Sequence, residues 1–133
     1  MYLLDSNVCI RLLNTGHPGI EDQFRRHTPA DISLCSIVRA ELLFGARHSQ
    51  RVAANLQRLN RFFSPLGSLP FDDSCAEVYA VIRHELSLRG QLIGPNDMMT
   101  AATALANDAV LVTHNQKEFG RIHGLQLEDW EAE

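Results

Sequence analysis

Apolar and polar residues follow two different periods along this chain. Short apolar runs, typical of buried strands, occupy residues 2–4, 32–35 and 109–113, with weaker candidates at 66–71 and 125–127. Between these runs, apolar residues recur at helical spacing. This spacing predicts helices over about 6–13, 18–27, 36–46, 49–63, 74–90 and 98–106. Strands that alternate with helices predict an α/β fold with a mostly parallel sheet and right-handed crossovers.

Local signals predict where several helices begin and end. Ser6 is expected to cap the first helix, and Asn14-Thr-Gly16 to stop it. Pro18 suits the first turn of the second helix. Ser74 and Glu77 form a capping-box pattern at the start of the longest helix.

Length and composition indicate one compact globular domain over residues 1–133. The 45% hydrophobic and 21% charged fractions argue against a disordered or fibrous chain. The sequence has no run of about 18 apolar residues and no signal-peptide pattern, so we expect a cytoplasmic protein without membrane association. The three widely spaced cysteines contain no CxxC pair, which favours buried free thiols over a zinc site or a disulfide framework.

The net charge of −4 conceals a basic region. The stretch 39–61 holds five arginines and a single acid, Glu41. If one helix covers 47–63, four of these arginines share a face that could bind a polyanion such as RNA: Arg47, Arg51, Arg58 and Arg61. The alternative is a solvated helix face with no ligand.

Three acidic residues stand where an α/β fold collects reactive groups. Asp5 follows the first strand, Asp97 begins a helix, and Glu41 interrupts an apolar helix. Each has an ordinary explanation: helix capping for the two aspartates, and a salt bridge to Arg39 or Arg47 for Glu41. If the three converge, their mutual repulsion calls for a hard cation such as Mg²⁺ or Mn²⁺, which could activate water.

Four segments occur in an order that resembles a known family. They are Leu4-Asp-Ser-Asn7, the stretch 36–46 with Glu41 and Gly45, the loop Ile93-Gly-Pro-Asn-Asp97, and Leu111-Val-Thr-His-Asn-Gln-Lys-Glu-Phe119. Together they resemble the PIN-domain ribonucleases, and most closely the VapC toxins of bacterial toxin–antitoxin pairs. The resemblance covers nearly the whole chain and implies a single three-layer α/β/α PIN domain that cuts RNA with Mg²⁺ or Mn²⁺.

The resemblance also implies roles for individual residues. Asp5 and Asp97 correspond to metal ligands, and Glu41 to a third acid that binds the metal directly or through water. Ser6 stands where many relatives have threonine and would orient a carboxylate or a metal-bound water.

The fourth acidic position of the family is less clear in this chain. Relatives often carry an aspartate near the end of the fourth strand, where this sequence has Asn115. We expect Glu118 to close the site, with Asn115 as a polar neighbour. His114 is interpreted as an incidental surface histidine, and Trp130 as a lid on the edge of the fold.

The resemblance implies several partners. They are an RNA substrate, notably initiator transfer RNA cut in the anticodon loop, a VapB-like antitoxin, and a second copy of the chain. Apolar helices around 42–44 and 56–63 could form the homodimer, and operator DNA would be bound only through the antitoxin.

Two other functions remain open at this point. One is phosphoryl transfer from an aspartyl phosphate, although Asn7 stands where that chemistry needs a second aspartate and Lys117 is the only lysine. The other is a non-catalytic PIN-like module that binds RNA or a partner protein.

Overall fold

In the computed structural model, which describes residues 1–14 and 17–132, five strands form one sheet. The strands are β1 (Tyr2–Leu4), β2 (Ile32–Cys35), β3 (Gly67–Leu69), β4 (Val110–Val112) and β5 (Leu127–Glu128). Their order is β3-β2-β1-β4-β5, and each of the four pairings is parallel. The predicted α/β class is confirmed, and β1 lies at the centre of the sheet.

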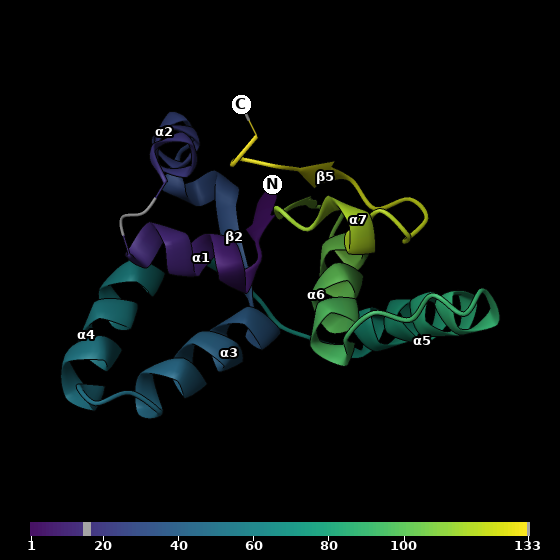
Figure 1. The fold of residues 1–133 in the computed structure, drawn as a ribbon, viewed down its shortest axis with the longest axis horizontal. Helices are drawn as coiled ribbons and strands as arrows, with labels where there is room; N and C mark the ends of the chain where they lie inside the picture. The colour runs from purple at the N-terminus through teal and green to yellow at the C-terminus, as the bar shows by residue number, and fades with distance from the viewer. Residues whose placement is uncertain (15–16, 133) are drawn as a thin grey trace.

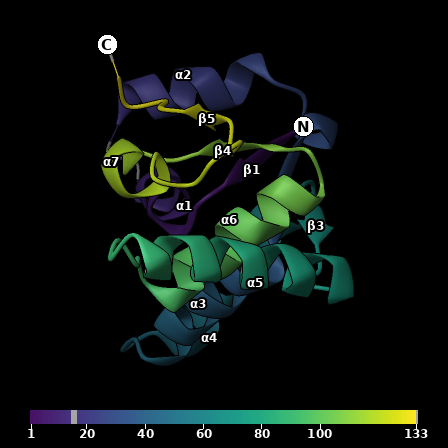
Figure 2. The same cartoon turned by 90° about the vertical axis from the view of Figure 1, so that its right-hand side faces the viewer.

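Helices cover both faces of this sheet. They are α1 (Ser6–Leu13), α2 (Pro18–Arg26), α3 (Ser36–Arg47), α4 (Val52–Phe63), α5 (Asp73–Leu88), α6 (Pro95–Ala106) and α7 (Gln116–Phe119), with a 3₁₀ turn at Pro29–Asp31. Figure 2 shows α2 on one side of the strands and α3 to α6 on the other. Helix α5 packs against α6, and the two helices cross at a steep angle in Figure 1. This arrangement is the three-layer fold that the family resemblance implies.

The middle of the sheet forms the core. Leu3, Leu4, Leu34, Leu111 and Val112 are completely buried. Removing such side chains from water is the main force that stabilises the fold. The thiols of the three cysteines are free and buried, as the sequence predicted. In the described ranges, no helix has both the length and the apolar character needed to span a membrane.

Two predicted helix caps are wrong. Asp5, rather than Ser6, caps α1, because its carboxylate accepts a hydrogen bond from the Val8 N–H at 2.9 Å. Asp72 caps α5 in the same way through Cys75, so the predicted box that starts at Ser74 does not form. The N-cap therefore lies one residue earlier than predicted in α1 and two residues earlier in α5. Asn14 is the C-cap of α1, whereas residues 15 and 16 of the predicted stop lie outside the described residues.

The four arginines do not lie on one helix. Helix α4 begins at Val52, with Arg51 as its N-cap, whereas Arg47 is the last residue of α3. A turn separates the two helices, and in it the Ser49 N–H donates to the Ala46 carbonyl at 3.3 Å. The prediction of one arginine-bearing helix face over 47–63 is therefore wrong, and the four side chains spread over two helices.

Candidate active site

Asp5 lies at the centre of the site because β1 lies at the centre of the sheet. Its backbone N–H donates to the Val112 carbonyl at the end of β4, at 3.1 Å. Its side chain is only 8% exposed. Burial raises the pKa of Asp5, and hydrogen bonds from the Thr113 side chain and the Val8 N–H offset part of that rise. A buried carboxylate with a raised pKa is the kind of group that a cation would stabilise.

Glu41 reaches the same place from α3. The Ser6 hydroxyl donates to its Oε1 at 2.8 Å, so the first residue of α1 holds this carboxylate. The salt bridge considered as an alternative is absent: in the described part of the chain, Glu41 pairs with neither Arg39 nor Arg47. The Arg39 guanidinium lies instead over the Phe63 ring, 4.2 Å from its centroid.

Asp97 brings the third carboxylate from the first turn of α6, where it is half-buried. Burial raises the pKa of Asp97, and the negative charges of Glu41, Asp5 and Glu118 raise it further. The charges of three acids that are far from Asp97 in the sequence therefore act on it in the folded chain.

Asn115 and Glu118 have different places at the start of α7. The Asn115 side chain caps this helix, with its Oδ1 accepting from the Glu118 N–H at 3.3 Å. The Asn115 N–H donates to Thr113 Oγ1 at 3.1 Å. The Glu118 charge acts on Asp97, whereas Asn115 supports the turn that leads to Glu118.

The chemistry of these four acids suits a hard divalent cation, but among the described residues no three of them bring their oxygens within 4.8 Å of one another; the group that meets this distance is His114, Asp129 and Glu131. Among the described residues, none of the four acids forms an ion pair with a lysine, arginine or histidine. Carboxylate oxygens that repel one another without a basic partner are the ligands that Mg²⁺ and Mn²⁺ prefer. Such a site can activate water and stabilise charge on a phosphate.

Comparison with known proteins identifies the family. The PIN domain family model matches residues 2–125. The chain belongs to the PIN domain family. Ribonuclease VapC2 of Rickettsia felis is 38% identical over 98% of both chains, and the tRNA(fMet)-specific endonuclease VapC of Salmonella typhimurium is 36% identical over 97% of both. The DNA-bound VapBC structure from Salmonella typhimurium superposes with a TM-score of 0.91 at 36% identity, over 97% of both chains.

These matches confirm the predicted resemblance to the VapC group of PIN-domain ribonucleases. PIN-domain nucleases generally use a divalent metal, which agrees with the acidic side chains of Asp5, Glu41, Asp97 and Glu118, none of which forms an ion pair in the described part of the chain.

Sequence reasoning missed one residue of this PIN domain that touches the site. Thr113 is completely buried at the end of β4, and its side chain is hydrogen-bonded to Asp5. The available signal was a hydroxyl at the carboxyl end of a parallel strand, which is where such folds place functional groups.

The segment after β5 contributes a second group of charges, which the sequence did not predict. His114 Nδ1 lies 3.0 Å from Asp129 Oδ2 and 3.3 Å from Glu131 Oε2. Arg11 Nε lies 2.8 Å from Glu131 Oε1, and the Glu131 charge also raises the pKa of Asp5. The imidazole of His114 is exposed, as expected of a surface histidine, but it contacts two carboxylates. Trp130 is buried and its ring stacks on His27, in agreement with its predicted role as a lid.

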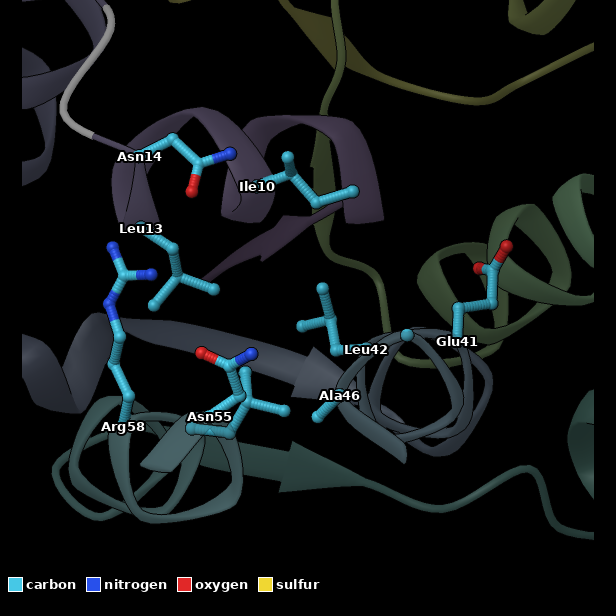
Figure 3. Close-up of a pocket in the computed structure, with 10 residues that line it drawn as sticks. Ile10, Leu13, Asn14, Glu41, Leu42, Ala46, Asn55 and Arg58 are labelled. Carbon is cyan, nitrogen blue, oxygen red and sulfur yellow. The ribbon is translucent and has the colours of Figure 1, made fainter. Parts of the chain in front are cut away.

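Two hollows of the PIN domain adjoin the carboxylates. One, of about 710 Å³, includes Asp5, Arg11 and His114. The other, of about 330 Å³, lies between α1, α3 and α4 and includes both Glu41 and Arg58 (Figure 3). Of the four predicted RNA-binding arginines, Arg58 lines this second hollow; Arg47, Arg51 and Arg61 are exposed but do not line it.

Proposed function

We propose that this chain is a metal-dependent endoribonuclease toxin of a toxin–antitoxin pair. The observation that carries the proposal is the group of carboxylates around Asp97, which raise its pKa and have no basic partner in the described ranges. The ribonucleases among its relatives, which match the whole length of the chain, support the same activity.

In this proposal, Asp5 and Asp97 hold Mg²⁺ or Mn²⁺, and Glu41 is the third acid, while Glu118 closes the site beside Asp97 and Asn115 positions it. A bound divalent ion lowers the pKa of water and offsets negative charge on the phosphate that is cut.

The protein's own groups orient these ligands. The Ser6 hydroxyl donates a hydrogen bond to Glu41 Oε1. The other oxygen of this carboxylate, Oε2, would then accept a proton from the attacking water. The Thr113 side chain and the Val8 N–H fix the carboxylate of Asp5. Side chains that are held by hydrogen bonds lose little conformational freedom when they bind a metal or substrate. Metal ligands are generally oriented by such hydrogen bonds.

The substrate that we propose is transfer RNA, cut in a single-stranded loop such as the anticodon loop of the initiator species. Support comes from the relative in Salmonella typhimurium, which is named as a tRNA(fMet)-specific endonuclease. Four exposed arginines would bind the RNA backbone: Arg47 at the end of α3, Arg51 at the N-cap of α4, and Arg58 and Arg61 within α4.

The partners that we propose are a VapB-like antitoxin and a second copy of the chain. The structural relative from Salmonella typhimurium is a VapBC complex on DNA, which supports an antitoxin that also links the toxin to operator DNA. Phe44 of α3 is 69% exposed and offers apolar surface for the homodimer. Free thiols and an RNA substrate fit a cytoplasmic protein.

The test is cleavage of bacterial transfer RNA by the purified protein without antitoxin, in Mg²⁺ and in EDTA. We expect discrete fragments in Mg²⁺ alone, and a loss of at least about 100-fold in rate for Asp97→Asn, because it removes a metal ligand. Glu77→Gln, an exposed change on α5, is the control and should cut normally. If folded wild type and Asp97→Asn bind RNA equally and neither cuts it, the chain is a non-catalytic binding module instead.

A further inference from the structure

The hollow that adjoins Glu41 has a distinct composition at each end. Glu41 lies at one side and Arg58 at the other, as Figure 3 shows. Between them the lining is mainly apolar, with Ile10, Leu13, Leu42 and Leu59. Its volume of about 330 Å³ is at the small end of the range for ligand sites, which suits one flat group rather than a helix or a duplex.

A glycine keeps one wall of this hollow open. Gly45 lies one helical turn after Glu41 and Leu42, so the three residues share a face of α3. A Cβ at position 45 would meet no heavy atom within 4 Å. Glycine is less favourable than alanine inside a helix. The space next to Gly45 is therefore open, and a side chain that starts there can extend into the hollow that Gly45 lines.

Asn55 provides a polar group on the α4 side of the hollow. In the described ranges its side chain forms a single hydrogen bond, from Nδ2 to Ser49 Oγ at 2.9 Å. Its Oδ1 is then available to an N–H donor that enters the hollow. Nucleobases carry such donors on their edges and have apolar faces.

We infer that this hollow binds one unpaired nucleobase of the RNA, next to the phosphate that is cut. The inference rests on the proposed function, because Glu41 belongs both to the hollow and to the carboxylate cluster. The base would lie between the leucines, with its edge at Asn55, while Arg58 contacts the next phosphate along the chain.

An RNA base fits these features better than an apolar side chain of a protein partner. The hollow has the acid Glu41 at one end and the guanidinium of Arg58 at the other. This arrangement matches a nucleotide with one phosphate at the metal site beside Glu41 and the next phosphate at Arg58. An aliphatic side chain would fill the apolar middle but leave Asn55 and Arg58 without new partners.

The first test fills the hollow and measures RNA binding without cleavage. We would titrate end-labelled bacterial transfer RNA in EDTA with wild type, Gly45→Leu and Ala53→Leu. Ala53 is exposed on α4, outside the hollow, so it controls for an added leucine. We expect Gly45→Leu to weaken binding about tenfold or more and Ala53→Leu to have little effect. Thermal melting by circular dichroism verifies that both variants fold.

The second test asks which nucleotide enters the hollow. Synthetic stem-loops that span the mapped cut, each with one abasic nucleotide beside it, would be cleaved in Mg²⁺. At one position we expect removal of the base to lower kcat/KM for wild type and Ala53→Leu. For Gly45→Leu we expect no such effect, because the filled hollow can no longer contact that base.

The outcomes separate the two proposals. Wild-type RNA binding by folded Gly45→Leu overturns the inference, whether or not RNA is cut. If each abasic nucleotide changes kcat/KM by the same factor in wild type and in both variants, the inference about the hollow is also overturned. The proposed nuclease function is unaffected by that result. RNA that is bound through the hollow but never cut overturns the proposed function alone.

Discussion

At the scale of single residues, Ser6 connects the two halves of the site. It follows Asp5 directly in the sequence, and its hydroxyl donates to Glu41, 35 positions further along the chain, at 2.8 Å. One side chain therefore fixes the distance between the start of α1 and the middle of α3. A hydroxyl that orients a metal ligand in this way affects activity without touching the substrate.

Ser6→Ala tests this role. We expect cleavage to fall about 10- to 100-fold, because Glu41 loses the group that orients it. The Mg²⁺ concentration needed for half-maximal activity should rise as well. Ser6→Thr keeps the hydroxyl and should retain most activity. Equal activity of the alanine and threonine variants across a Mg²⁺ titration would contradict the role.

Asp97 gives a prediction about stability and pH. Its pKa is raised in the folded chain, so the folded state binds a proton more tightly than the unfolded state. The free energy of unfolding of the metal-free protein must then fall as pH rises above about 4 and through the raised pKa. In EDTA, Asp97→Asn should melt a few degrees above wild type at pH 7, and this difference should shrink towards pH 4. Differential scanning calorimetry at the two pH values measures it, and a difference that does not depend on pH would refute it.

At the scale of elements, the sequence predicts the strands and the helices better than it predicts the helix ends. Apolar runs located β1, β2 and β4 because buried parallel strands have few polar positions. The predicted caps were wrong because Asp5 stands one residue before Ser6, and Asp72 two residues before Ser74, and either residue of each pair could cap a helix. Which of the two candidate residues caps the helix depends on the backbone dihedral angles at each position. The pattern of side chains in the sequence does not reveal these angles.

The cap of α5 offers a direct comparison of these neighbours. Asp72→Ala removes the acceptor of the Cys75 N–H and should lower the melting temperature by a few degrees. Ser74→Ala, which alters the residue that the sequence pattern favours, should have little effect. Thermal melts of both variants at neutral pH measure the difference. A larger effect at Ser74 would restore the predicted capping box.

At the scale of the whole molecule, topology explains how much of the site the sequence could predict. The carboxyl ends of parallel strands share an edge, so an acid after β1, one in the helix after β2 and one at the start of α6 could be expected to meet. Glu131 could not be predicted, because its contact with Arg11 depends on how the segment after β5 folds back. The spread of the arginines over two helices also depends on a turn that helical periodicity does not reveal.

This spread of the arginines predicts unequal roles in RNA binding. Arg58 lines the hollow next to Glu41, whereas Arg47 ends α3 outside it. Arg58→Ala should weaken RNA binding more than Arg47→Ala and lower the slope of log K against log salt by about one. Filter binding of transfer RNA in EDTA over a range of salt concentrations measures both. Equal effects of the two variants would mean that the arginines act only through their summed charge.

The central position of β1 has a consequence for how the protein is made. β4, which pairs with β1 and leads into Thr113 beside Asp5, is synthesised about a hundred residues after Asp5. Until β4 emerges and inserts beside β1, the sheet edge that gathers the acids is incomplete. If the proposed nuclease function holds, a nascent chain would therefore not cut RNA before β4 has emerged and paired with β1.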